Sequence, residues 1–137
     1  MAANVLADAG FLVALLSKRD RHHDWARGQA RESAPPWRTC DAALSEAFHL
    51  LRSPGVTALA ALLRRGALVP AFAAAPDLER LLGLMERYAD LPMSFADACL
   101  VRMTETLPDP ILLTTDADFR IYRRHGRQTI PARMPAG

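Results

Sequence analysis

Four acidic side chains lie in apolar stretches of this sequence, where a carboxylate is costly unless a cation meets it. Asp8 lies in VLADAGFLVALL, and no other charged residue precedes Lys18. Glu46 lies in AALSEAFHLL, Asp97 lies in SFADACLV, and Asp116 ends ILLTTD. None of these acids has a lysine or arginine at helical or cross-strand spacing within its own stretch. They are therefore the first candidates for chemistry.

A divalent cation would explain these acids together. Carboxylates that converge on one pocket repel one another, and a cation relieves both this repulsion and the cost of burial. Oxygen ligands favour Mg²⁺, or Mn²⁺, over zinc.

Each acid also has a structural interpretation. Asp97 follows Ser94 by three residues, which is the spacing of a helix capping box. Glu46 fits an exposed position at the rim of an apolar helix face, and Asp116 fits the start of a turn after a strand. Asp8 is the hardest of the four to explain in this way, because an acid within an apolar run has few structural roles.

The elements that must position these acids alternate along the chain. We expect strands at 5–7, 37–40, 67–70 and 111–114, and a weaker fifth strand at 128–132. We expect helices at 10–18, 21–32, 42–51, 56–65, 76–88 and 94–107. Asp20 is the expected cap of the second helix, and Gly66 the expected end of the fourth. This alternation predicts an α/β fold in which helices cover both faces of a parallel sheet of four to five short strands.

Ligands of such folds bind outside the carboxyl ends of the strands. Asp8 ends the first expected strand and Asp116 follows the fourth, so both belong at this edge. If strand geometry continues past Asp116, the side chain of Asp118 points the same way, which makes Asp118 an auxiliary candidate. Phe119 is expected in the core.

Composition narrows the function classes. A chain of 137 residues that is 50% hydrophobic and 23% charged predicts one globular domain over 1–137, and a net charge of +2 does not by itself indicate nucleic-acid binding. The two cysteines, the absence of a signal-peptide pattern and the short apolar runs predict a cytoplasmic protein without a membrane span. The sequence has neither G-x-G-x-x-G nor a P-loop, which argues against a nucleotide-binding domain. A phosphoryl-transfer receiver domain needs a lysine late in its sheet, and the only lysine here is Lys18, near the start of the chain.

The chain resembles the PIN-domain ribonucleases, specifically their VapC toxin-like group. The resemblance is carried by VLADAGFLVALL with RDRHHDWA, TCDAALSEAFHLL, LMERYADLPMSFADACLV and LLTTDADFRIYRR. Proteins of this group carry an acidic quartet in four such segments. The matching positions here are Asp8, Glu46, Asp97 and Asp116, and Thr114 matches the threonine that precedes the last acid.

The resemblance implies a three-layer α/β/α PIN-like fold and a Mg²⁺-dependent endoribonuclease, with Mn²⁺ as a second possible ion. Asp8, Asp97 and Asp116 would then be the metal ligands, and Glu46 would complete the shell or orient the attacking water. Metal-activated water would cleave RNA in line and leave a 5′-phosphate and a 3′-hydroxyl. The resemblance further implies a homodimer and a VapB-like antitoxin whose tail enters the active site.

The chain differs from the group at one position, and its C-terminal arginines have more than one explanation. Relatives often place serine or threonine just after the first aspartate, where this chain has Ala9 and Gly10, so a hydroxyl that helps to orient water is missing there. Arg120, Arg123 and Arg124 are candidates for RNA phosphate contacts, but a solvated surface or an acidic partner explains them equally well. The alternative function is a catalytically silent PIN-fold protein that binds RNA or a partner.

Overall fold

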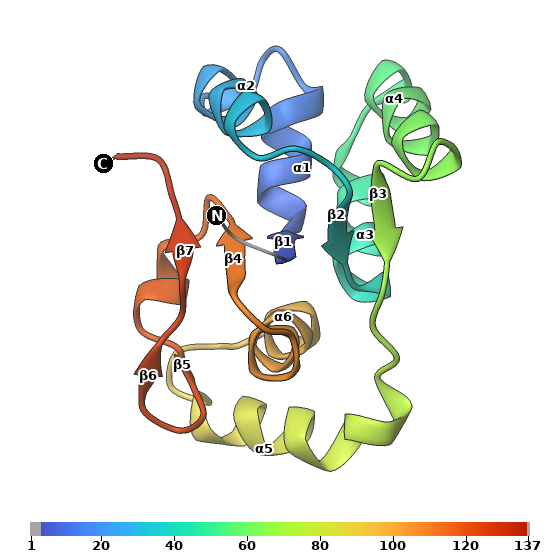
Figure 1. Cartoon of the computed structure of the whole chain (residues 1–137). Coiled ribbons are helices and arrows are strands. Elements are labelled where there is room, and N and C mark those ends of the chain that lie inside the picture. Colours follow the sequence, from blue (N-terminus) through green and yellow to red (C-terminus); the bar gives the residue numbers. More distant parts are fainter. Residues whose placement is uncertain (1–3, 137) are drawn as a thin grey trace.

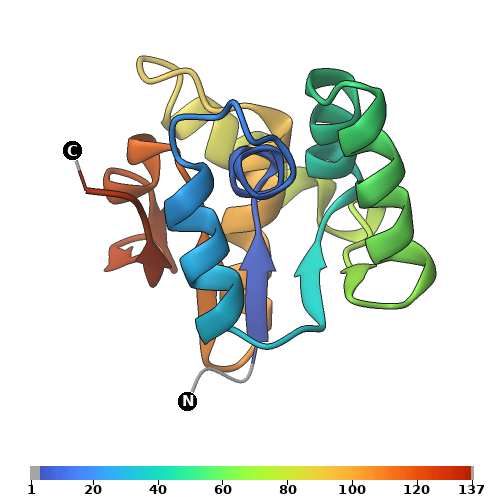
Figure 2. The same cartoon turned by 90° about the horizontal axis from the view of Figure 1, so that it is seen from above.

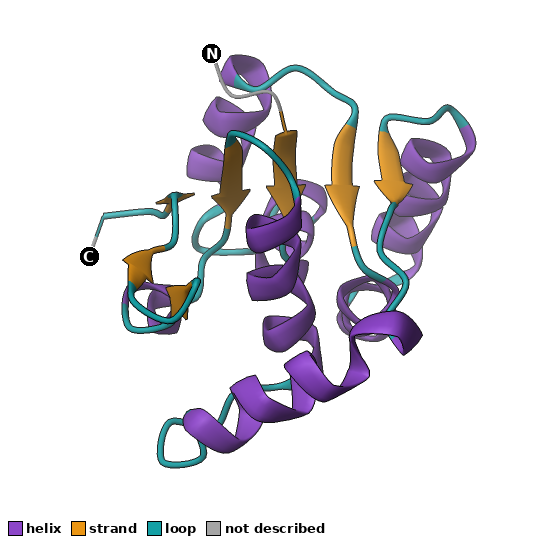
Figure 3. Cartoon of the chain, turned by 60° about the horizontal axis from the view of Figure 1, so that its bottom comes forward, coloured by secondary structure: helices purple, strands orange, loops and turns teal. Residues whose placement is uncertain are grey.

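The structure, a computed structural model, describes residues 4–136, so residues 1–3 and 137 of the predicted domain lie outside the described part. Its main sheet has five parallel strands in the order β3-β2-β1-β4-β7, which lie side by side in Figure 3. These strands are β1 (Asn4–Ala7), β2 (Trp37–Thr39), β3 (Leu68–Pro70), β4 (Pro110–Leu113) and β7 (Ala132–Arg133). The predicted α/β class with a central parallel sheet is confirmed.

Helices cover both faces of this sheet, as the alternation predicted. They are α1 (Ala9–Leu16), α2 (His23–Glu32), α3 (Asp41–Leu50), α4 (Ser53–Arg64), α5 (Leu78–Arg87) and α6 (Phe95–Thr106). Figure 1 shows α1 and α2 on one side of the sheet and α5 and α6 on the other. Helices α1 and α2 contact each other and lie side by side when seen from above (Figure 2). Two short 3-10 turns, η1 (Ala75–Asp77) and η2 (Ala117–Arg120), precede α5 and follow β4.

The two central strands form the middle of the core because their residues are almost wholly apolar. All four residues of β1 are buried, and Leu6 pairs with Leu112 across the β1–β4 register. Strands that are covered on both faces read as continuous apolar runs, which is why VLA and ILL stood out in the sequence. The α1 side chain Phe11 packs edge-on against Trp37 of β2 at 5.5 Å between ring centroids. A first strand fixed in this way holds the residue that follows it, Asp8, at the edge of the core.

The starts of α2 and α4 differ from the prediction, each for a local reason. The helix α2 begins at His23, because the Asp20 carboxylate accepts a hydrogen bond from the His22 backbone amide and closes a separate turn. The helix α4 begins at Ser53, since a proline is tolerated in the first helical turn, where its missing N–H is not needed. Gly66 does end the segment after α4, with a φ of +74° that favours glycine.

The expected fifth strand at 128–132 divides into two short strands. Gln128–Thr129 forms β6, which pairs antiparallel with β5 (Arg123–Arg124), whereas Ala132–Arg133 forms β7 and joins the main sheet beside β4. Two-residue strands carry too little alternation for the division to be visible in the sequence.

In the described residues 4–136, no helix is long and apolar enough to cross a membrane.

Candidate active site

Asp8 is the buried centre of the carboxylate group. It follows β1, has only 6% of its surface exposed, and its Oδ1 accepts a hydrogen bond from the Ala9 amide at 2.7 Å. Its Oδ2 accepts a second bond from the Thr114 hydroxyl, also at 2.7 Å. Burial, together with the smaller effect of the Asp97 and Glu46 carboxylates, raises the pKa of Asp8 from 3.8 to about 7, although the two hydrogen bonds act to lower it. Among the described residues, no lysine or arginine makes an ion pair with it.

Thr114 connects the ends of β1 and β4. While its hydroxyl donates to Asp8, the same oxygen accepts a hydrogen bond from the Asp116 amide at 3.0 Å. The threonine is itself fully buried. A single side chain therefore fixes both the direction of the Asp8 carboxylate and the path of the chain into Asp116.

Asp97 lies in the first turn of α6 and completes a capping box. Ser94 accepts from the Asp97 amide at 3.0 Å, and Asp97 Oδ2 accepts from the Ser94 amide at 3.3 Å. The structural interpretation of Asp97 is thus confirmed, but it does not remove the residue from the site. Burial raises the pKa of Asp97, and the nearby charge of Asp116 raises it as well. Its Oδ1 has no hydrogen-bond partner within residues 4–136 and is free to bind a ligand.

Asp116 and Asp118 lie in a turn and not in a continued strand. Asp116 Oδ1 accepts from the Asp118 amide at 2.9 Å, which caps η2. The expectation that strand geometry would point both side chains the same way is therefore wrong, because the Asp116 carboxylate itself closes the turn. The two acids still interact, since burial and the charge of Asp116 both raise the pKa of Asp118.

Glu46 projects from α3 at the rim of this group. Its side chain is exposed, as the structural interpretation expected, but it is close enough for its charge to raise the pKa of Asp8. The fold therefore links the four predicted acids, from four separate segments, through their charges: Asp8 interacts with Asp97 and Glu46, and Asp97 interacts with Asp116.

The carboxylates do not form a closed metal cage. Within residues 4–136, no group of three His, Cys, Asp or Glu side chains is arranged to hold a metal ion. Asp97 and Asp116 each direct one carboxylate oxygen to a backbone amide. The donor set still suits a hard divalent cation, because it consists of carboxylate oxygens and includes one carboxylate buried without a positive partner. Mg²⁺ commonly keeps several waters and uses few protein ligands, so an open set of this kind is adequate for it.

The C-terminal arginines have mainly structural contacts. Arg123 Nη1 donates to the carbonyls of Arg120 and Ile121, at 2.7 and 3.1 Å. Arg124 donates to the Thr104 carbonyl of α6. Arg120 is exposed and remains the freest of the three predicted RNA-binding arginines.

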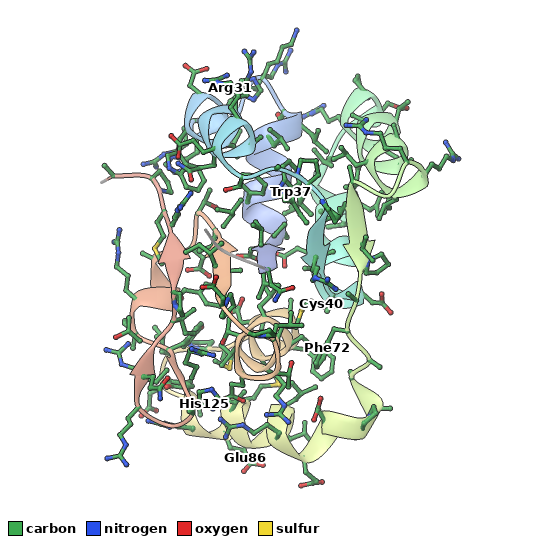
Figure 4. The ribbon with its side chains drawn as sticks, viewed as in Figure 1. Arg31, Trp37, Cys40, Phe72, Glu86 and His125 are labelled. Atoms are coloured by element: carbon green, nitrogen blue, oxygen red, sulfur yellow. The ribbon has the colours of Figure 1, made fainter. Side chains whose placement is uncertain are left out.

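Two contacts near the site were not anticipated from the sequence. The Tyr122 hydroxyl donates to Asp97 Oδ2 at 3.2 Å, and burial raises the pKa of this tyrosine. The free thiols of Cys40 and Cys99 are buried together, and their mutual hydrogen bond raises the pKa of Cys40, which lies beside α6 in Figure 4. The spacing of Phe119 and Tyr122 indicates packing, but no local signal gives partners this distant in the chain.

The position after the first aspartate is closely packed. A Cβ atom on Gly10 would lie 2.3 Å from Thr115 Oγ1. The Thr115 hydroxyl therefore occupies the space beside the start of α1 where a side chain at position 10 would begin. The start of α1 has no hydroxyl side chain of its own, but Thr115, in the segment after β4, places a hydroxyl there.

Comparison with known proteins agrees with this architecture. The PIN domain family model matches residues 5–124. The fold is similar to that of VapC20 from Mycobacterium tuberculosis, described as a sarcin-ricin loop cleaving toxin, with a TM-score of 0.74 and 22% identity over 84% of this chain and 92% of that one. No curated protein sequence matches the chain.

Proposed function

Because the chain belongs to the PIN domain family, we propose that it is a Mg²⁺-dependent endoribonuclease, which hydrolyses RNA phosphodiester bonds with metal-activated water. The observation that carries this proposal is the carboxylate group around Asp8. A buried acid whose pKa is raised to about 7, with Asp97 and Glu46 adding negative charge and no ion pair among the described residues, is a costly arrangement. Perturbed acids at the carboxyl edge of a parallel sheet indicate function more than stability.

In this proposal Asp8, Asp97 and Asp116 hold the cation, and Thr114 keeps Asp8 in position through its hydrogen bond. When bound, Mg²⁺ lowers the pKa of a water and neutralises charge on the phosphate. Glu46 is exposed at the rim, where its carboxylate can accept a proton from the attacking water. Asp118 is auxiliary, since its carboxylate lies near Asp116 but belongs to the following turn.

We further propose that the protein is the toxin of a type II toxin–antitoxin pair and acts in the cytoplasm. The support is the fold shared with VapC20, which is described as a toxin that cleaves the sarcin-ricin loop. A VapB-like antitoxin and a homodimer belong to this proposal.

A catalytically silent RNA-binding or partner-binding protein is the second candidate. The open arrangement of the acids favours it, because no three metal-binding side chains converge in residues 4–136. The two candidates differ in one measurable property, which is Mg²⁺-dependent cleavage.

The deciding experiment compares RNA cleavage by the purified, antitoxin-free wild type with that by Asp8→Asn and Asp97→Asn. Asp90→Asn is the matched control, because Asp90 is exposed in the turn after α5. We expect cleavage with Mg²⁺ and none with EDTA, at least a hundredfold loss in the two site variants, on the order of one lost metal-ligand contact, and no loss in the control. If the wild type leaves RNA intact, or if the site variants cut as well as Asp90→Asn, the silent protein is the correct interpretation.

A further inference from the structure

A cavity lies between α2, η2 and β7. Its volume of about 510 Å³ is typical of ligand sites. Trp25 and Gln29 line it from α2, Phe119 and Arg120 line it from η2, and Arg133 lines it from β7. We propose that this cavity binds one unpaired nucleotide of an RNA strand whose neighbouring phosphate lies at the carboxylates. The inference rests on the proposed function, because it takes RNA as the ligand.

The cavity has positive charge available for a phosphate. Arg120 is exposed, and the Arg133 side chain has 46% of its surface exposed. In residues 4–136, the ion pair of Arg133 is with Glu32 at 3.8 Å, and the glutamate side chain is 67% exposed. Such an exposed pair contributes little and exchanges readily. Both guanidinium groups can therefore bind phosphate oxygens, for which their planar donors are well suited.

The cavity also has groups that suit a base. Single-stranded RNA is commonly recognised by stacking of a base on an aromatic side chain and by hydrogen bonds to the base edge. Trp25 provides an indole at the wall, held edge-on by Phe11 at 6.2 Å between ring centroids. Gln29 Oε1 is buried and has no hydrogen-bond partner among the described residues. A buried acceptor without a donor is costly, and a turn of the Gln29 side chain into the cavity would let the amino group of a base supply the missing donor.

The position of the cavity connects it to the carboxylates. Arg120 follows Asp118 by two residues, so their Cα atoms are separated by at most about 8 Å. On the other wall, the Thr114 amide donates to the Arg133 carbonyl at 3.2 Å, and the hydroxyl of the same threonine holds Asp8. Residues that line the cavity, Arg120 and Arg133, are therefore joined to the residues that fix the site by two chain positions and by one backbone hydrogen bond, which places the cavity next to the carboxylates.

Intrinsic fluorescence offers a direct test, because the chain has two tryptophans and only Trp25 lines the cavity. In a Trp37→Phe background, we would titrate a short single-stranded oligoribonucleotide in EDTA and follow Trp25. Gln29→Met removes the amide at nearly constant volume, and Arg133→Ala removes one wall charge. Arg64→Ala is the matched control, since Arg64 is exposed on α4 and does not line the cavity.

We expect saturable quenching, with affinity weakened roughly three- to tenfold by Gln29→Met and by Arg133→Ala, as for the loss of one hydrogen bond or charged contact. Arg64→Ala should change the affinity by less than about twofold, the effect of a distant charge. An unchanged Trp25 signal, or equal weakening by Arg133→Ala and Arg64→Ala, overturns the proposal and leaves a protein partner as the occupant. Equal affinity for adenosine monophosphate would assign the cavity to a free nucleotide and overturn the RNA subsite.

This outcome is separable from the proposed function. EDTA removes the cation, so quenching measures RNA binding whether or not the protein cuts RNA. The comparison of Asp8 variants with the wild type in Mg²⁺ measures cleavage alone. Loss of quenching with intact cleavage refutes only the subsite, and quenching without cleavage refutes only the nuclease.

Discussion

Replacement of Asp8 by asparagine should stabilise the metal-free protein, and increasingly so as the pH rises. The folded state raises the pKa of Asp8 from 3.8 to about 7. Because the folded pKa is higher, the folded state binds the proton more tightly than the unfolded state does. The resulting stability is present in full below pH 3.8 and is lost as the pH rises through about 7. Asparagine does not ionise and escapes this loss.

The size of the effect follows from the two pKa values. At about 1.4 kcal/mol per pKa unit, the rise corresponds to about 4 kcal/mol lost by the wild type well above pH 7. At pH 5, where the folded carboxyl is still mostly protonated, the loss is only about 2 kcal/mol. Asparagine has one acceptor oxygen and keeps only one of the bonds from Ala9 and Thr114, which costs about 1 kcal/mol at either pH. The advantage of the variant should therefore grow by roughly 2–3 kcal/mol between pH 5 and pH 8.

Urea denaturation in EDTA at these two pH values measures the free energy of unfolding of wild type, Asp8→Asn and the exposed control Asp90→Asn. The control should show no pH-dependent advantage. Excess Mg²⁺ at pH 8 should stabilise the wild type more than Asp8→Asn, because a ligand that binds only the folded state adds stability in proportion to its affinity. If the advantage of Asp8→Asn is the same at pH 5 and pH 8, the folded state does not raise the pKa of Asp8. Ionisation of Asp8 would then cost no stability, and the main argument for a cation at this site would be refuted.

Three further substitutions test a contact of the site and two contacts that hold α6 in place. Tyr122→Phe removes a hydrogen-bond donor to the Asp97 carboxylate and should raise the pKa of this acid. The acid limb of the cleavage–pH profile should therefore move to higher pH, and a limb that does not move would contradict the hydrogen bond. Ser94→Ala should lower the free energy of unfolding in urea by about 1 kcal/mol through loss of the α6 cap, whereas Ser94→Thr should retain most of it. Glu105→Gln should lower the free energy of unfolding by about 2 kcal/mol, because the Glu105 carboxylate accepts hydrogen bonds from the charged guanidinium of Arg80. A change in thermal stability as small as that of Ser94→Thr would argue against this contribution.

The sequence predicted the fold and the four acids for related reasons. The strands were visible because a covered parallel sheet requires nearly continuous apolar residues, as in VLA before Asp8 and ILL before Asp116. The acids were visible because an ionised group in such surroundings has no local partner to explain it. The edge at which Asp8 and Asp116 meet then followed from the parallel connection of their strands.

The errors arose where a single side chain decides the local path. Asp20 and Asp116 each use a carboxylate oxygen to bind the amide two residues ahead, and these bonds move the start of α2 and turn Asp118 out of strand geometry. Periodicity contains no signal for such turns. The bond from Tyr122 to Asp97 was equally hidden, because it joins a residue that follows η2 to a residue of α6, and only the folded chain brings these two together.

The close approach of Gly10 to Thr115 has a consequence for how this site can change. The space between the start of α1 and the end of β4 holds one hydroxyl, and here the segment after β4 supplies it. A serine at position 10 would crowd Thr115 unless that residue became smaller or turned away, so the two positions should vary as a pair. Exchange of the hydroxyl from one element to the other would preserve its place beside the start of α1, although neither position alone would look conserved in a set of such sequences.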